Sequence, residues 1–233
     1  IAVIPEGLEE LGLKELDGFG ANSLKRLRRA VSFEADMACF FRLQLNARLP
    51  FRILREISRF HCNGPTSLYQ HIQKSFDWET WLNPSISFKV DVSGSCNGLP
   101  HSHFTALQVK NALVDFQREI WGARSKINLQ NPDLCLHLLL SNQECVLSLD
   151  GSGDSLHRRG YRAAMGAAPL KENLAAGLVR ITNWNLDIPL VDPLCGSGTF
   201  LIEGLSDALN IAPGLNRTFL FESWVDFDER LWK

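Results

Sequence analysis

Residues 192–200 read Asp192-Pro193-Leu194-Cys195-Gly196-Ser197-Gly198-Thr199-Phe200, and this stretch decides the fold. A short apolar segment at 188–191 predicts a strand before it, and the residues through about 209 predict a helix after it. A strand, a loop with two glycines and a helix open a nucleotide-type α/β site, because glycine permits a tight turn and the helix start offers free N–H groups. Spacing alone leaves an ordinary strand-to-helix turn open. No Gly-Lys-Ser/Thr follows and position 201 is leucine, so the stretch is neither a Walker loop nor a complete G-x-G-x-x-G.

The region just upstream of this unit is rich in turns and basic residues. Residues 151–155 predict turns, and residues 157–162 carry three arginines and a histidine. Pro169 is expected to open a helix, because its missing N–H is not needed in the first turn. The buried stripe of that helix is predicted to consist of Leu170, Leu174, Leu178 and Ile181.

The first 150 residues mix predicted strands and helices. Apolar runs predict strands at 2–4, 31–33, 86–92, 134–140 and 145–149. Helical spacing predicts helices at 6–17, from 36 to before Pro50, at 66–82, and from about 102 to a stop at Gly122. Residues 51–60 fit either a short helix or an extended segment. The last two strands form a hairpin candidate, and no phosphate loop or catalytic constellation is visible in this part.

Composition excludes several classes of protein. The 233 residues are 45% hydrophobic and 21% charged, which is typical of a globular chain and not of a disordered one. No apolar run suits a membrane helix, and the first residues show no secretory signal. The six cysteines contain no CxxC, so we expect reduced thiols in a cytoplasmic protein. His101 and His103 lack an obvious third ligand, so we expect no metal site.

Charge is segregated although the net charge is only -2. Residues 24–59 carry nine basic residues, eight of them arginine, against three acidic ones, whereas residues 1–17 carry five acids and one lysine. Arginine suits phosphate because its planar fork donates two hydrogen bonds at once. The segment therefore fits a nucleic-acid backbone surface, or equally a solvated face whose arginines pair with local acids.

Residues 192–203 resemble motif I of the S-adenosylmethionine-dependent RNA methyltransferases that carry an RNA-binding THUMP domain ahead of a Rossmann-like catalytic domain. The resemblance continues upstream through 149–162 and 168–176, and downstream through 210–215 and Phe221-Glu222-Ser223-Trp224. Within this family the chain is most similar to the bacterial 23S ribosomal RNA guanine-N2 methyltransferases. Residues 5–11 resemble the N-terminal ferredoxin-like segment of that group, and the stretch including 109–116 resembles its THUMP domain.

The resemblance implies an S-adenosylmethionine site. Its expected cofactor-binding residues are Asp192, Cys195, Gly196, Ser197, Gly198, Thr199, Tyr161, Pro169, Lys171 and Glu172. The glycines should pass under the methionine and ribose, and Asp192 should meet the cofactor ammonium unless it only caps the turn. Thr199 is a candidate helix cap, and residues 161–172 resemble a lid over the pocket.

The resemblance also implies a ribosomal RNA partner. Together with the charge pattern, it predicts RNA contacts by Arg26, Arg28, Arg29, Arg52, Arg55, Arg158, Arg159 and Arg162. The family's Asn/Asp-Pro-Pro-Tyr segment and its ribose-binding acid do not occur in this sequence. The catalytic residues are therefore unassigned, and we expect this chain to be inactive by itself.

The predicted fold class is α+β: a ferredoxin-like/THUMP part followed by the first, truncated part of a Rossmann-like α/β methyltransferase domain. The predicted parts are an N-terminal ferredoxin-like segment at 1–35, a THUMP domain at 36–153, and a linker with the start of the catalytic domain at 154–233. The expected reaction is methyl transfer to guanine N2 of 23S ribosomal RNA. Transfer RNA guanine-N2 methylation and a non-catalytic RNA-binding module are the alternatives.

Overall fold

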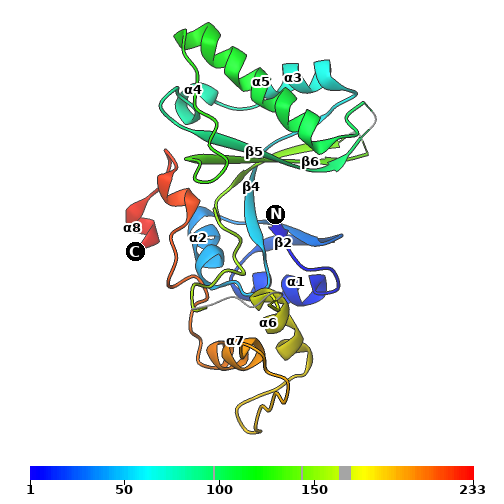
Figure 1. Cartoon of the computed structure of the whole chain (residues 1–233), viewed down its shortest axis with the longest axis vertical. Helices are drawn as coiled ribbons and strands as arrows, with labels where there is room; N and C mark the ends of the chain where they lie inside the picture. Colours follow the sequence, from blue (N-terminus) through cyan, green and yellow to red (C-terminus); the bar gives the residue numbers. More distant parts are fainter. Residues whose placement is uncertain (97, 143, 163–168) are drawn as a thin grey trace. The chain divides into compact units, whose positions relative to one another are not determined.

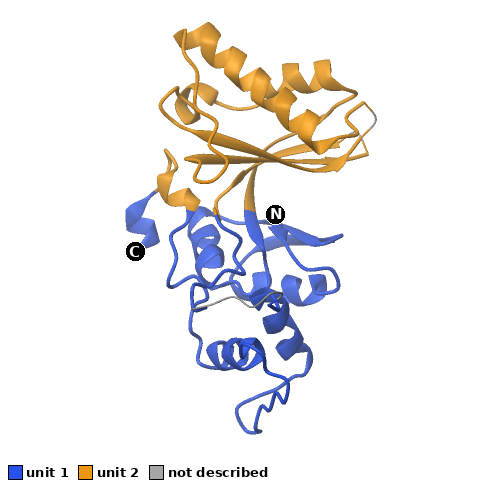
Figure 2. Cartoon of the chain, viewed as in Figure 1, with its two compact units in different colours: residues 1–53, 154–219, 228–233 blue, residues 54–153, 220–227 orange. Residues whose placement is uncertain are grey.

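The chain forms two compact units in a computed structural model that describes residues 1–96, 98–142, 144–162 and 169–233. The first unit comprises residues 1–53, 154–219 and 228–233, and the second comprises residues 54–153 and 220–227 (Figure 2). The predicted boundary after residue 35 lies inside the first unit. The division between the two compact units falls between Ile53 and Leu54, within one strand.

The N-terminal part of the first unit is a small antiparallel sheet with two helices. Its elements are β1 (Ala2–Val3), α1 (Glu9–Gly18), β2 (Asn22–Leu27), β3 (Ala30–Glu34), α2 (Met37–Asn46) and the start of β4 (Arg52–His61). β1 lies between β3 and β4, with Ala2 opposite both Val31 and Ile53. Sequence periodicity missed β2, whose side chains are mostly exposed and therefore show no apolar alternation.

Close packing holds α1 against the start of the chain. A Cβ at Gly12 would come within 2.2 Å of Ile4 Cδ1, so a larger residue there would have to displace the Ile4 side chain. Ile4, Leu16 and Val31 are almost fully buried, and they form part of the apolar core of this sheet.

The second unit is a four-stranded sheet in the order β4, β7, β6, β5, with helices that include α3 and α5 (Figure 1). Its further elements are α3 (Pro65–Lys74), α4 (Trp78–Trp81), β5 (Phe88–Ser95), α5 (Ser102–Trp121), β6 (Leu134–Ser141), β7 (Glu144–Asp150) and the 3-10 turn η1 (Leu220–Ser223). β5 and β6 are parallel and are joined through α5, as parallel neighbours require a crossover. The predicted hairpin β6–β7 is confirmed.

Local signals explain where these elements end. Gly122 adopts φ 64° and its N–H donates to Arg118 O, which confirms the predicted stop of α5. The prediction of a single helix at 66–82 is wrong, because helix α3 ends at Lys74. A second helix, α4, then begins after Asp77, whose side chain accepts the Thr80 N–H as an N-terminal cap. Residues 51–60 are extended, as part of β4.

The C-terminal part of the first unit contains α6 (Glu172–Ile181) and α7 (Thr199–Ala208), which pack on each other, and α8 (Glu229–Trp232), which contacts α2. The helix begins at Glu172 and not at Pro169. The leucine stripe predicted for it is also wrong: Leu178 and Ile181 are exposed, whereas Ala175 and Ala176 are buried. A Cβ at Gly177 would come within 2.4 Å of Leu8 Cδ1, so the small-residue face is the one that fits closely in the core.

The strand predicted at 188–191 does not form. Ile188 and Val191 are 56% and 77% exposed, and no strand of the described residues pairs with this segment. An extended segment without a neighbour has no partner for its backbone N–H and C=O groups, so it does not become a strand. None of the helices that the structure describes has the length and apolar character of a membrane span.

Candidate functional site

The glycine loop before α7 has the backbone that the sequence predicts. Gly196 and Gly198 adopt φ 53° and 71°, in the left-handed region that favours glycine. The Gly198 N–H donates to Cys195 O at 2.7 Å, and the first bond of α7 runs from the Ile202 N–H to Gly198 O. A Cβ at Gly196 would meet nothing within 4 Å, so the space beside the loop is open. The loop can therefore admit a ligand close to its backbone and to the N-terminus of a helix.

Arg162 holds this loop from the side. Its guanidinium donates to Ser197 Oγ at 3.2 Å and to Thr199 Oγ1 at 3.1 Å. The same group donates to Leu170 O and to Glu172 Oε1, both at 2.5 Å. The Arg162 side chain is only 11% exposed. Arg162 thus connects its own segment to the residues at the start of α6 and to the glycine loop.

Tyr161 is tied to the helix that follows the loop. Its hydroxyl donates to Glu203 Oε1 at 3.1 Å. Burial and the nearby carboxylates of Glu203 and Glu172 raise the pKa of Tyr161, so the phenol stays protonated.

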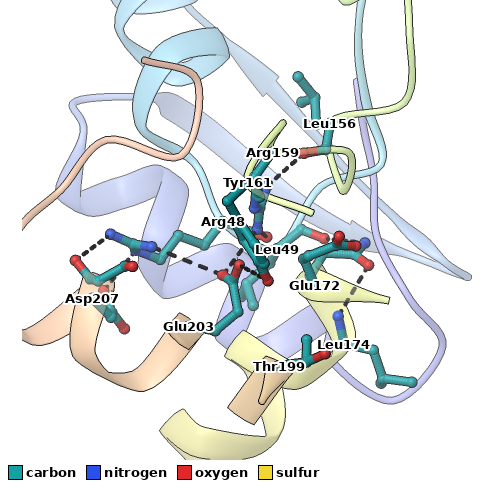
Figure 3. A network of polar contacts seen from close by, with 12 residues as sticks. Arg48, Leu49, Leu156, Arg159, Tyr161, Glu172, Leu174, Thr199, Glu203 and Asp207 are labelled. Atoms are coloured by element: carbon teal, nitrogen blue, oxygen red, sulfur yellow. Dashed lines mark hydrogen bonds and ion pairs between the residues drawn. The ribbon is translucent and has the colours of Figure 1, made fainter. Parts of the chain in front are cut away.

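The side chains of α7 take part in a buried network of charges (Figure 3). Arg159 and Arg48 lie 3.5 and 3.9 Å from Glu203 Oε2, and all three side chains are at most 5% exposed. Arg48 Nε also lies 2.9 Å from Asp207 Oδ1. Burial raises the pKa of Glu203, although both arginines and Tyr161 oppose this. These contacts attach α7 to residues far from it in the sequence.

Arg180 extends the network to the N-terminal helix. It donates to both carboxylate oxygens of Asp207, at 2.7 and 3.0 Å, and to Glu15 Oε1 at 2.6 Å. Burial acts to raise the pKa of Asp207, but Arg180 and Arg48 outweigh it, so that pKa lies below its usual value. Glu15 also accepts the backbone N–H groups of Arg48 and Leu49. The acid on α1 is therefore an integral part of the support for α6 and α7.

Comparison with known proteins identifies three regions. Residues 1–54 match the RlmL ferredoxin-like domain, residues 67–150 match the THUMP domain, and residues 159–231 match the RMKL-like methyltransferase domain. The chain is 43% identical, over 238 residues, to the ribosomal RNA large subunit methyltransferase K/L of Ectopseudomonas mendocina. The chain belongs to the family of THUMP-containing RNA methyltransferases. The predicted family and fold class are thereby confirmed.

Two further relatives of this THUMP-containing methyltransferase chain are informative. The putative RNA methyltransferase slr0064 of Synechocystis is 44% identical over 232 residues, which are 99% of this chain and 60% of that protein. The structure of SMU.472, a putative methyltransferase complexed with SAH, superposes with a TM-score of 0.84 at 31% identity, covering 99% of this chain and 61% of that one. The alignment with the K/L relative covers 100% of this chain but only 33% of that protein, so this chain spans about a third of the relative's length.

The predicted cofactor residues lie in two parts of the sequence, the glycine loop with its flanks at 192–199 and the upstream segment at 161–172. Cys195, Gly196 and Ser197 are exposed on the loop, and Gly198 is half-buried there. Asp192 Oδ1 accepts the Leu194 N–H at 3.1 Å, so the turn-capping alternative for Asp192 is present. Thr199 does not cap α7, since Gly198 is the cap residue.

The upstream residues differ in their surroundings. Glu172 is buried and is held by Arg162, whereas Lys171 lies over the Phe51 ring at 5.0 Å. Pro169 is exposed, and residue 168 of the resemblance lies outside the described residues. Among the described residues, no cluster of three or more metal-ligating side chains occurs.

Two of the arginines predicted to contact RNA are directed into the protein. Arg159 is 4% exposed and donates to Leu156 O and Arg48 O. Arg162 is occupied by the glycine loop and Glu172. Arg158, next to them, is 64% exposed and lies 3.5 Å from the exposed Asp154, so its side chain is accessible to RNA.

The remaining predicted RNA-binding arginines of the chain lie in different surroundings. Arg26 pairs with Glu10 at 2.9 Å and Arg28 with Glu6 at 3.6 Å, which is the alternative that the charge pattern left open. Arg29 is exposed and Arg52 is half-buried. Arg55 stacks over Trp81 and Trp224 and pairs with Asp226 at 2.5 Å.

Sequence reasoning gave no individual role to five members of the buried network, and it placed a sixth member, Arg159, with the RNA contacts. The five are Glu15, Arg48, Arg180, and the α7 pair Glu203 and Asp207; they come from four separate parts of the sequence, and their residue types are typical of surfaces. The sequence contained no local signal that they would meet.

Proposed function

We propose that the protein containing this chain transfers a methyl group from S-adenosylmethionine to the exocyclic N2 of a guanine in 23S ribosomal RNA. The observation that carries this proposal is the open glycine loop at the start of α7, in a chain 43% identical to a ribosomal RNA large subunit methyltransferase K/L. The SAH in the SMU.472 complex supports the choice of cofactor.

The residues present fit one part of that cofactor. Gly196 and Gly198 leave room for a ligand beside the backbone, and the first turn of α7 offers N–H groups to it. When bound, S-adenosylmethionine supplies an electrophilic methyl group on a sulfonium. The loop residues hold and orient the ligand, while Arg162 and the buried network keep the loop in one conformation.

Held beside the glycine loop, S-adenosylmethionine would supply the methyl group to N2 and leave as S-adenosylhomocysteine, and the proton displaced from N2 would pass to water. The guanine must be unpaired, or must leave its helix, for N2 to reach the methyl group. We assign recognition of the surrounding RNA to residues 54–153, which include the THUMP match, and to exposed arginines of residues 24–59. The six free cysteines agree with a cytoplasmic location, where ribosomal RNA is modified.

Methyl incorporation by the full-length protein tests the proposal. The substrates are 23S ribosomal RNA and transfer RNA from a strain that lacks the corresponding gene, with radioactive S-adenosylmethionine as donor. We expect label on the ribosomal RNA, located at guanine N2 by nucleoside mass spectrometry. Label on transfer RNA alone supports the transfer RNA alternative, and absence of label on both supports the non-catalytic RNA-binding alternative.

A further inference from the structure

Arg158 and Arg162 lie four residues apart in one basic segment, but their side chains have opposite surroundings. Arg158 is 64% exposed and has one exposed partner at 3.5 Å. Arg162 is 11% exposed, and four protein oxygens accept its N–H groups at 2.5–3.2 Å. The residue that the sequence places with the RNA contacts is thus directed into the protein.

The acceptors of Arg162 come from both sides of the glycine loop. Leu170 O and Glu172 lie at the start of α6, and Ser197 and Thr199 lie at the end of the loop and the start of α7. Ser197 Oγ and Thr199 Oγ1 also lie 3.2 Å from each other. The Arg162 guanidinium therefore fixes both hydroxyls on either side of Gly198.

Only a planar group with several N–H donors can reach this set of acceptors together. Arginine has five such donors in a rigid fork, whereas lysine offers a single ammonium at the end of a flexible chain. Hydrogen bonds to a charged group contribute more to stability than hydrogen bonds between neutral groups. Loss of the fork would remove this support from a loop whose residues 195–197 are exposed.

We propose that Arg162 is a positioning residue for the cofactor loop and not an RNA contact. This inference rests on the proposed function, since the ligand of the loop is S-adenosylmethionine there. Arg162 acts through Ser197 and Thr199 by holding the loop in the conformation that admits the ligand. Binding then does not have to order the loop first.

The experiment compares Arg162→Met and Arg162→Lys with the matched control Arg158→Met in the full-length protein. Calorimetry measures the Kd for S-adenosylmethionine, and filter binding measures the Kd for 23S ribosomal RNA fragments. We expect the cofactor Kd to rise about tenfold or more in both Arg162 variants, given the hydrogen bonds lost. The RNA Kd should stay within about twofold of the parent. Arg158→Met should leave the cofactor Kd unchanged.

Other outcomes separate this inference from the proposed function. A cofactor Kd that stays within twofold in Arg162→Lys and Arg162→Met overturns the inference alone. Weaker RNA binding with unchanged cofactor binding would show that Arg162 contacts RNA and does not position the cofactor loop. Absence of cofactor binding in the parent overturns the proposed function. If Arg162→Met does not fold, the cofactor Kd values of Arg162→Lys and Thr199→Val decide the question. Thr199→Val removes one acceptor of Arg162 at nearly constant side-chain volume.

Discussion

Arg48 Nε lies 2.9 Å from Asp207 Oδ1, although 158 residues lie between them in the sequence. Arg48 follows the end of α2, and Asp207 lies on α7. The Arg48 side chain also donates to the carbonyl oxygens of Ser206 and Ile211. The region matching the ferredoxin-like domain is therefore joined to the helix that follows the glycine loop. Its N-terminal helices act as structural support for the candidate cofactor site.

Arg48→Met should destabilise the protein strongly. The change leaves Asp207 without one of its two cations, and it leaves the buried Glu203 with Arg159 as its nearby cation. Removing one partner of a buried ion pair costs about 3–5 kcal/mol, because the other charge stays buried. Urea denaturation of the first unit measures the loss. Arg42→Met is the control, since Arg42 is exposed and donates to Phe19 O, and it should cost less than about 1 kcal/mol. Equal losses in the two variants would contradict a central role for Arg48.

Asp207 and Glu203 should affect stability with opposite dependence on pH. The pKa of Asp207 is lowered in the folded state, so its stabilising effect is complete above its usual value of 3.8 and disappears as pH falls through the lower folded pKa. The pKa of Glu203 is raised above 4.5, so its effect is greatest below 4.5 and is lost as pH rises toward the folded pKa. Urea midpoints from pH 3 to pH 8 test this. Asp207→Asn should cost most at neutral pH, and Glu203→Gln should cost least there. Parallel curves for both variants would show that the two carboxyls do not differ.

Strong local patterns made much of the second unit predictable from sequence. α5 has a regular apolar stripe and a glycine stop, and the β6–β7 hairpin has two apolar runs around a short polar turn. The buried face of α6 could not be predicted, because it depends on the distant contact of Gly177 with Leu8. The same holds for the buried Arg159: it is adjacent to the exposed Arg158 in sequence, and only the fold brings it to Glu203 and to the carbonyl oxygen of Arg48. Residues 188–191 have the composition of a strand but lack a paired neighbour among the described residues.

Gly198→Val should abolish cofactor binding by the full-length protein. Gly198 adopts φ 71°, where a β-branched residue is strained, so valine there would disfavour the turn that leads into α7. Gly18→Ala is the control, because a Cβ there meets nothing and φ is not in the left-handed region. Calorimetry with S-adenosylmethionine and circular dichroism report binding and folding separately. Unchanged affinity in a folded Gly198→Val protein would move the cofactor site elsewhere.

This 233-residue chain by itself should bind S-adenosylmethionine weakly or not at all. Leu194 and Val191, on the approach to the glycine loop, are 92% and 77% exposed, so the described residues provide little apolar enclosure for a ligand. Calorimetry on the chain and on the full-length protein tests this difference. We expect binding only by the longer protein, and micromolar affinity of the chain would show that the loop and α7 are sufficient.

Neutralising Arg26, Arg28 and Arg29 together should weaken binding to all structured RNAs to a similar extent. Arg26 and Arg28 are 57% and 86% exposed, so phosphate can replace their partners Glu10 and Glu6 at little cost. Three lost phosphate contacts should flatten the dependence of log affinity on log salt by at most about 2.7.

The acidic partners provide the matched test of the arginine surface. Glu6→Gln with Glu10→Gln releases Arg26 and Arg28 from their ion pairs and should strengthen RNA binding modestly, mainly at low salt. Filter binding across a salt series measures both sets of variants on the same RNA. If the triple arginine variant and the double glutamine variant both bind like the parent, the β2–β3 arginines serve only the exposed ion pairs with the N-terminal acids.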